Sequence, residues 1–343
     1  MILSGFDLFL VFATSFILVG SLTPLMRKFA IKKEIIDKPN SAHKSHKKAV
    51  PYLGGVAIMI GVTTVVYLAL LLKNSPTNYF LLATFLIAPG ILLGLVGLID
   101  DIQNLSPLPR FIAQSSAALF STIILTLTDS FGNPTSAPIF NFLISMIWII
   151  GICNSINFFD NIDGGAAGTI AISALGTAII AINTQQILIA SFAIVLVGST
   201  IGFLIWNRSP ARIYMGDAGS LFLGFMIAIL TVRLKPSTDE WIGSYSVPFF
   251  LLAAPILDTS IVVTSRILKQ KSPFVGGTDH LSHRLIAYGI NRKATVFTLW
   301  IITSFFASIG VLITLTSFNE SFLIATGLLV FISFFILFTK LEK

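Results

Sequence analysis

About eleven apolar runs, each roughly 20 residues long, are separated by short polar loops, and this pattern constrains the fold most. A run of that length spans a bilayer as a helix, because a helix satisfies its own backbone hydrogen bonds. Only 11% of the 343 residues are charged, too few to cover a soluble protein. We therefore expect an all-α polytopic membrane protein with a single integral-membrane domain over residues 1–343. The predicted spans lie near residues 6–26, 53–72, 79–99, 111–128, 139–158, 166–183, 187–206, 219–232, 246–267, 294–316 and 320–339.

Lys and Arg residues are distributed unevenly between the two sets of loops. All but three of the 22 fall on one side, and the exceptions are Lys73, Arg233 and Lys235. Because positively charged loops face the cytoplasm, we expect the N-terminus outside and the C-terminus inside a cytoplasmic (inner) membrane. Topology and lipid headgroups explain the net charge of +7 better than nucleic acid does.

Six aspartates fall on this same predicted cytoplasmic side, although acidic residues contribute little to membrane topology. Asp100 and Asp101 are adjacent at the end of an apolar run, where two carboxylates repel each other and tolerate low dielectric poorly. The others are Asp160, Asp163, Asp217 and Asp279. Their convergence on one face predicts a functional site. The single cysteine, Cys153, excludes an internal disulfide framework and a thiolate metal cluster.

The stretch NSINFFDNIDGGAAG places polar side chains every three residues at the end of an apolar helix. They are Asn154, Asn157, Asp160 and Asp163. This spacing keeps their oxygens roughly on one face, and such oxygens are the ligands that Mg²⁺ or Mn²⁺ prefers. Helix capping and turn chemistry explain two of the four positions but not easily all of them. The pattern therefore indicates a functional site.

The stretch NRSPARIYMGDAGSLFLG places Asp217 at the start of an apolar helix. An aspartate there is often only an N-cap, but free N–H groups at a helix start also bind phosphate. Arg208 and Arg212 lie just upstream, where they suit either a bound anion or lipid headgroups.

Two basic loops contain all four histidines. SPFVGGTDHLSHRLIAYG places His280, His283 and Arg284 within about one helical turn, which suits a bound pyrophosphate better than a zinc ion. HKSHKKAVPYLGG, near the N-terminus, suits either lipid headgroups or the phosphate of a lipid substrate.

Acids, oxygen ligands and a basic edge on one membrane face are suited to Mg²⁺-dependent phosphoryl or pyrophosphate chemistry. A membrane setting implies a lipid substrate, so we expect transfer between a soluble diphosphate compound and a lipid phosphate. A cation- or proton-coupled transporter would explain the intramembrane acid Asp258, but it needs polar groups near the bilayer midplane. A lipid-binding scaffold explains the basic loops but not the Asn and Asp spacing.

Five ordered stretches match one known family. They are HKSHKKAVPYLGG, GLIDDIQNLSPLPRFIAQ, NSINFFDNIDGGAAG, IYMGDAGSLFLG and SPFVGGTDHLSHRL. Over roughly residues 37–290 the chain resembles the polyprenyl-phosphate N-acetylhexosamine-1-phosphate transferases, and within them the WecA/TagO-like branch. This implies transfer of N-acetylglucosamine 1-phosphate from a UDP-sugar to undecaprenyl phosphate, with release of UMP, at the start of cell-envelope polysaccharide synthesis. The phospho-N-acetylmuramoyl-pentapeptide transferases share most of these motifs and are the nearest alternative.

The resemblance also implies a Mg²⁺ cofactor, a site on the cytoplasmic face and, from the frequency of dimers among relatives, a homodimer. Asp100 and Asp101 match catalytic paired aspartates on the lipid-phosphate side, and Asn157 and Asp217 match metal ligands, with Asp217 also catalytic. Asp163 and Tyr214 match positions near the uracil. The full set of predicted substrate-binding residues is Asn154, Asp160, Asp163, Arg212, Tyr214, His280, His283, Arg284, Lys44 and His46. Ser282 stands where many relatives have a histidine.

Overall fold

The computed structural model describes residues 4–37, 49–132, 135–238, 241–272 and 277–341. Within these residues it forms thirteen helices and one two-stranded sheet. The elements are α1 (Gly5–Lys32), β1 (Ile36–Asp37), β2 (Val50–Pro51), α2 (Gly54–Leu72), α3 (Thr77–Gln103), α4 (Pro107–Leu127), α5 (Pro138–Phe159), α6 (Gly165–Asn183), α7 (Ile187–Asn207), α8 (Gly216–Arg233), α9 (Trp241–Leu251), α10 (Ala253–Leu268), α11 (Leu281–Ala287), α12 (Arg292–Leu315) and α13 (Glu320–Lys340).

The helix lengths confirm the predicted architecture. Ten helices in the described residues are long and apolar enough to cross a membrane, and the number rises to eleven if the bent pair of α9 and α10 is one span. The protein is therefore an all-helical, multi-pass membrane protein. α3 extends past its predicted end at residue 99, so Asp100 and Asp101 lie on the last turn of a helix rather than beyond it.

The predicted span near residues 246–267 differs from its expected form. A single continuous helix over 246–267 is wrong, because α9 and α10 are bent by 78° at Leu252. Pro255 explains the break: it has no N–H for the carbonyl of Leu251, four residues earlier, and its ring clashes with that carbonyl. The bend directs α10 away from the line of α9.

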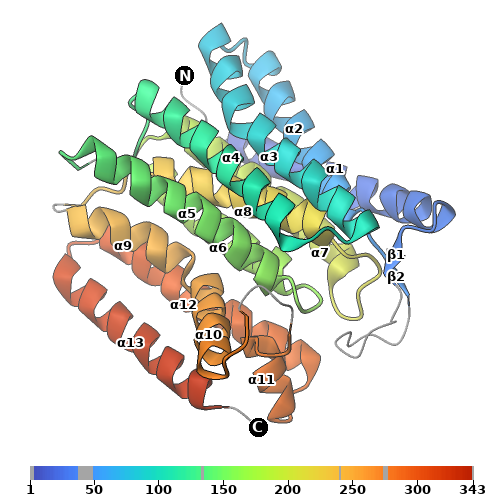
Figure 1. The fold of residues 1–343 in the computed structure, drawn as a ribbon. Coiled ribbons are helices and arrows are strands. Elements are labelled where there is room, and N and C mark those ends of the chain that lie inside the picture. Colours follow the sequence, from blue (N-terminus) through green and yellow to red (C-terminus); the bar gives the residue numbers. More distant parts are fainter. Residues whose placement is uncertain (1–3, 38–48, 133–134, 239–240, 273–276, 342–343) are drawn as a thin grey trace.

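α8 lies at the centre of the bundle, with α2, α3 and α5 packed against it (Figure 1). In α8, 78% of the residues in its most apolar 18-residue stretch are buried, whereas the corresponding share in α1 and α13 is 17%. A helix that is apolar on every side is expected in the middle of such a bundle. The backbone at the start of α8 is therefore surrounded by protein, while the Asp217 side chain stays partly exposed.

Small residues allow two helices to approach the start of α8 closely. A Cβ atom on Gly219 would lie 2.8 Å from the Cα atom of Gly55, and one on Gly97 would lie 2.6 Å from the amide nitrogen of Ala218. α2 and α3 thus meet α8 nearly backbone to backbone, as small residues permit in membrane helices. This contact brings the acidic end of α3 beside the start of α8.

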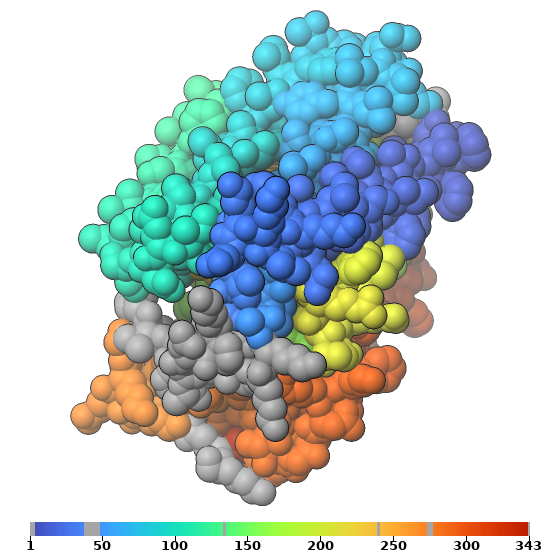
Figure 2. Space-filling view, turned by 90° about the vertical axis from the view of Figure 1, so that its right-hand side faces the viewer, coloured from blue at the N-terminus to red at the C-terminus, as the bar shows by residue number. Residues whose placement is uncertain are grey.

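Backbone hydrogen bonds join the segment before α2 to the segment before α8. β1 pairs with β2 in antiparallel fashion, and the Tyr214 N–H donates to Pro51 O at 2.9 Å. The Gly54 N–H donates in turn to Tyr214 O at 3.0 Å. Figure 2 shows the 207–215 segment (yellow) at the surface between the N-terminal helices (blue) and the C-terminal helices (orange). Segments far apart in the chain therefore meet at one end of the bundle.

We expect Gly55→Ala to destabilise the protein by about 1–3 kcal/mol, because its Cβ collides with the backbone of Gly219 and overpacking has costs of this order. Thermal unfolding in detergent measures the effect. Gly151→Ala is the matched control, since a Cβ there meets no atom within 4 Å and alanine favours a helix. If both variants unfold at the wild-type temperature, the proposed tight contact of α2 with α8 is wrong.

Candidate active site

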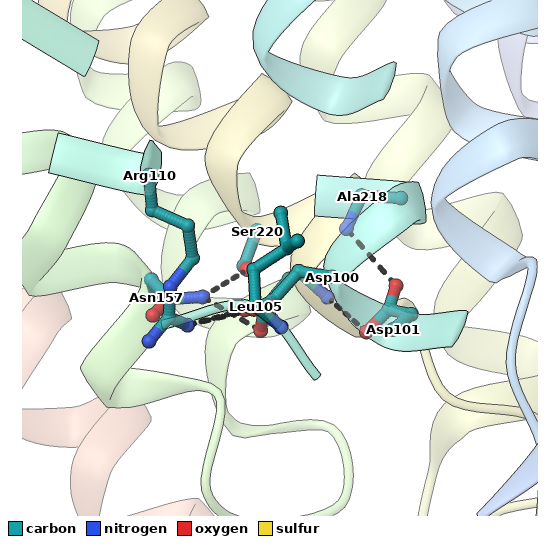
Figure 3. A network of polar contacts seen from close by, with 8 residues as sticks. Asp100, Asp101, Leu105, Arg110, Asn157, Ala218 and Ser220 are labelled. Atoms are coloured by element: carbon teal, nitrogen blue, oxygen red, sulfur yellow. Dashed lines mark hydrogen bonds and ion pairs between the residues drawn. The ribbon is translucent and has the colours of Figure 1, made fainter. Parts of the chain in front are cut away.

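Arg110, on the first turn of α4, holds two of the predicted site carboxylates together. Its Nη1 atom lies 2.8 Å from Asp100 Oδ2 and 2.9 Å from Asp217 Oδ2 (Figure 3). One guanidinium therefore bridges acids from α3 and α8. The sequence prediction missed this role, because an isolated arginine in a cytoplasmic loop is explained by topology alone. Its place on the first turn of the helix that follows Asp100 was the available signal.

Asn157, at the end of α5, holds the other side of Asp217. Its Nδ2 atom donates to Asp217 Oδ1 at 2.9 Å and to Ser220 Oγ at 2.9 Å (Figure 3). Asn154, one turn earlier, instead donates to Gln114 Oε1 on α4 at 2.8 Å. The structure thus brings Asn157 to Asp217, while Asn154 joins α5 to α4.

The adjacent aspartates Asp100 and Asp101 point to different partners. Asp100 accepts hydrogen bonds from Arg110 and from the Leu105 N–H at 2.6 Å. Asp101 accepts from the N–H groups of Asp217 at 2.9 Å and Ala218 at 3.2 Å. Its carboxylate therefore caps the positive end of the α8 dipole. The two neighbouring carboxylates therefore accept hydrogen bonds from different donors, which lets both lie at the end of α3.

The α5–α6 turn is fastened to the segment before α8. Asp163 Oδ2 accepts from the Ala211 N–H at 3.0 Å. Asn207 accepts from the Gly164 N–H at 2.9 Å and donates to Ile213 O at 3.0 Å. Asn207 was not among the predicted site residues, although its place at the end of an apolar run was a signal for capping.

A cavity of about 520 Å³ opens beside Asp163. Its lining includes the three cationic side chains Arg208, Arg212 and Lys293, and the indole of Trp300. The Arg212 guanidinium lies over the Trp206 ring, 5.8 Å from its centroid. The excess of positive charge suits a bound anion.

Tyr214 lies near Tyr52, with their ring centroids 6.3 Å apart. Burial raises the pKa of the Tyr214 hydroxyl, and the negative charges of Asp163 and Asp37 raise it further. The phenol therefore stays protonated at neutral pH and presents an aromatic face with a hydrogen-bond donor.

The segment 277–284, which carries His280 and His283 and is called the histidine loop below, packs against the end of α5. The His280 ring contacts the Phe158 ring edge-on, with centroids 6.2 Å apart, and the Ser282 hydroxyl donates to Asn161 Oδ1. Burial lowers the pKa of His283, and the neighbouring His280 lowers it further. The loop is thus placed next to the segment that carries Asn157.

Arg284 and Asp279 are engaged in contacts that hold this loop. Arg284 is 4% exposed and donates to Ser265 Oγ at 2.5 Å and to the Phe338 carbonyl at 3.0 Å. Asp279 pairs with Arg266 at 3.2 Å. Burial acts to raise the pKa of Asp279, but its contacts with Arg266 and Lys269 outweigh burial and lower it.

Two predicted substrate-binding residues, Lys44 and His46, lie outside the described residues.

The oxygen ligands suit a magnesium ion in their chemistry. Burial, together with the negative charges of Asp217 and Asp163, raises the pKa of Asp160 to about 7, so negative charge is crowded here. In the part of the chain that the structure describes, no group of three or more His, Cys, Asp or Glu side chains could hold a metal alone. Magnesium usually needs only one or two carboxylates, because water and substrate phosphates supply the rest. The donor set therefore fits Mg²⁺ together with a phosphorylated substrate.

We expect Asp160→Asn to stabilise the metal-free protein increasingly as the pH rises. Between the unfolded pKa of 3.8 and the folded value of about 7, the folded state holds the extra proton, so wild-type stability falls with rising pH. The variant lacks this loss. Its gain in unfolding temperature, measured with EDTA, should be small near pH 4 and largest near pH 8.

Asp129→Asn, at an exposed position, is the control for that series. A gain for Asp160→Asn that does not change between pH 4 and pH 8 would contradict the raised pKa.

Comparisons with known proteins agree with the motifs. Residues 83–235 match the model of glycosyl transferase family 4. The chain is 32% identical to a Bacillus subtilis (strain 168) protein named probable undecaprenyl-phosphate N-acetylglucosaminyl 1-phosphate transferase, over 86% of this chain and 82% of that protein.

More distant relatives carry two different names. Identity is 29% to the decaprenyl-phosphate N-acetylglucosaminephosphotransferase of Mycolicibacterium smegmatis, over 86% of this chain and 79% of that protein. Identity is also 29% to a phospho-N-acetylmuramoyl-pentapeptide-transferase of Staphylococcus saprophyticus, over 84% of this chain and 93% of that protein. The chain belongs to glycosyl transferase family 4, the polyprenyl-phosphate N-acetylhexosamine-1-phosphate transferases that its five motifs resemble.

Proposed function

We propose that the protein transfers N-acetylglucosamine 1-phosphate from UDP-N-acetylglucosamine to undecaprenyl phosphate and releases UMP. The observation that carries this proposal is the cluster at the start of α8, where Asp217 is held between Arg110 and Asn157 beside Asp100. Such a cluster is suited to phosphoryl transfer. The name of the Bacillus subtilis relative supports the transferred group and the acceptor.

The proposed orientation places this cluster at the cytoplasmic face of the cell membrane, with the N-terminus outside. The uneven distribution of Lys and Arg supports it. A nucleotide sugar would then reach the site from the cytoplasm, and the acceptor lipid would present its phosphate at the membrane surface.

In the proposed reaction, an oxygen of the acceptor phosphate attacks the β-phosphorus of the nucleotide sugar. The bond from that phosphorus to the bridging oxygen breaks, and UMP leaves with the oxygen. The acceptor is largely a dianion near neutral pH, so Asp100 need only position it with Arg110. The cationic cavity beside Asp163 is proposed to receive the donor.

Mg²⁺ is proposed to be held by Asp217 and Asn157, where it would neutralise charge on the diphosphate. Arg110 occupies one Asp217 oxygen, so its contact would have to shift to leave that oxygen to the metal. Asp101, whose carboxylate caps α8, is proposed to keep Asp217 in place rather than to react.

Transfer of phospho-N-acetylmuramoyl-pentapeptide is the second candidate, and the Staphylococcus saprophyticus relative favours it. Purified protein with undecaprenyl phosphate and Mg²⁺ should be offered each candidate donor as its UDP derivative, together with other UDP-sugars. We expect UMP and lipid product from UDP-N-acetylglucosamine. Product from the pentapeptide donor alone would select the second candidate, and no lipid-dependent UMP from any donor would refute both.

We also expect Asp217→Ala to lose at least about a hundredfold in UMP release, and more than Asp100→Asn does. Asp217 is the residue bound by both Arg110 and Asn157, whereas Asp100→Asn retains an oxygen for Arg110. Initial rates should be measured across a Mg²⁺ titration. Asp129→Asn, exposed at the far end of α4, is the control. Near-wild-type activity of Asp217→Ala with Mg²⁺ would overturn the metal assignment.

A further inference from the structure

A buried aspartate on α10 binds the histidine loop. Asp258 is 1% exposed, and its Oδ2 atom lies 2.8 Å from Nδ1 of His280. Its other oxygen, Oδ1, accepts from the Leu281 N–H at 2.6 Å. Both carboxylate oxygens therefore face the start of α11, 23 residues further along the chain.

This contact determines which nitrogen of His280 carries the proton. An ionised carboxylate can only accept hydrogen bonds, so Nδ1 of His280 must be the donor. Nε2, on the opposite side of the ring, has no hydrogen-bond partner among the residues that the structure describes. His280 is itself only 8% exposed. The ring is thus held by one nitrogen and has the other available.

The aromatic neighbours restrict the ring further. Phe158 meets it edge-on, with centroids 6.2 Å apart, and His283 lies 6.0 Å from it. Phe158 directly follows Asn157, which holds Asp217. His280 is therefore packed against the segment that builds the acidic cluster.

α10 contacts the loop at three places along one side. Besides Asp258, Ser265 accepts from Arg284 at 2.5 Å, and Arg266 pairs with Asp279 at 3.2 Å. Spacings of seven and eight residues put these positions on one helical face. The break before α10 turns this face toward the loop. A cap on the Leu281 N–H alone would need only one acceptor, yet the second oxygen is used on His280.

We propose that Asp258 is a positioning residue: it fixes His280 as the Nδ1-protonated tautomer, so that the unprotonated Nε2 can accept a hydrogen bond from a sugar hydroxyl of the nucleotide sugar. This inference rests on the proposed function for its ligand. Its physical basis is the one by which a carboxylate behind a functional imidazole sets the tautomer and ring orientation.

The tautomer can be measured without any activity. The chain has only four histidines, so ¹⁵N-histidine labelling gives few signals, and His280→Gln assigns the one of interest. We expect Nδ1 to be protonated in the wild-type protein. In Asp258→Asn the single amide oxygen stays on the Leu281 N–H and the NH₂ group faces Nδ1, so the proton should move to Nε2. The same tautomer in both proteins would overturn the proposal.

A double-mutant cycle tests the link to catalysis. Asp258→Asn should lower kcat/KM for the UDP-sugar by about 10- to 100-fold with the KM for undecaprenyl phosphate unchanged. In the His280→Gln background it should change kcat/KM less than about twofold. If the loss in the double variant equals the product of the losses in the two single variants, Asp258 does not act through His280.

Asp7→Asn is the matched control, because Asp7 is also ion-paired, to Lys73 at 2.7 Å, at the opposite end of α1 from β1. It should leave the kinetics unchanged. If the wild-type protein releases no UMP from any UDP-sugar, the proposed function fails, while the ¹⁵N spectra still decide whether Asp258 sets the His280 tautomer.

Discussion

The guanidinium of Arg110, shared between Asp100 and Asp217, is the interaction on which the site depends. Its Nη1 atom lies within 2.9 Å of acids from two helices that like charge would otherwise drive apart. Attraction at such distances is strong where protein replaces water. Removing the arginine would leave two partly buried acids without a counterion, a far larger penalty than losing a surface ion pair.

The backbone around this ion pair determines where the two acids can lie. Glycines let α2 and α3 contact the start of α8, and the 207–215 segment is held by hydrogen bonds to the loop before α2. Successive residues on a helix point about 100° apart. Asp100 therefore turns to Arg110 while Asp101 caps α8, so the two carboxylates point in different directions.

The bend between α9 and α10 connects the helix bundle to the loop that carries His280 and His283. Because α10 turns away from α9, one of its faces contacts the histidine loop through Asp258, Ser265 and Arg266. An acid within an apolar helix and a bend beside Pro255 thus have a common result. They bring a loop more than 100 residues further along the chain against the end of α5.

Local sequence patterns predicted the multi-pass helical fold and the gathering of Asp100, Asp101 and Asp217 at one site. Membrane spans are readable because lipid imposes its requirement on each run of about 20 residues separately. The hydrogen-bond partners of the polar side chains were harder to predict from the sequence. Arg284 was predicted to bind substrate, but its guanidinium donates to the Phe338 carbonyl, 54 residues away, and no local pattern indicates that contact. Arg110 was missed because topology alone explains an isolated arginine in a loop, and its contact with Asp217, 107 residues further on, has no local pattern.

The sequence by itself therefore determined the class of protein, the approximate positions of its helices and which residue types could bind a metal and a diphosphate. Burial of apolar runs and the chemistry of Asp, Asn and His act locally, and so they can be read locally. Only the tertiary structure decided that Asp217 binds Asn157 and Arg110, that Asp101 caps α8 and that Asp258 contacts His280. Those pairings depend on the close packing of helices, and that packing depends on the shapes of many distant residues together.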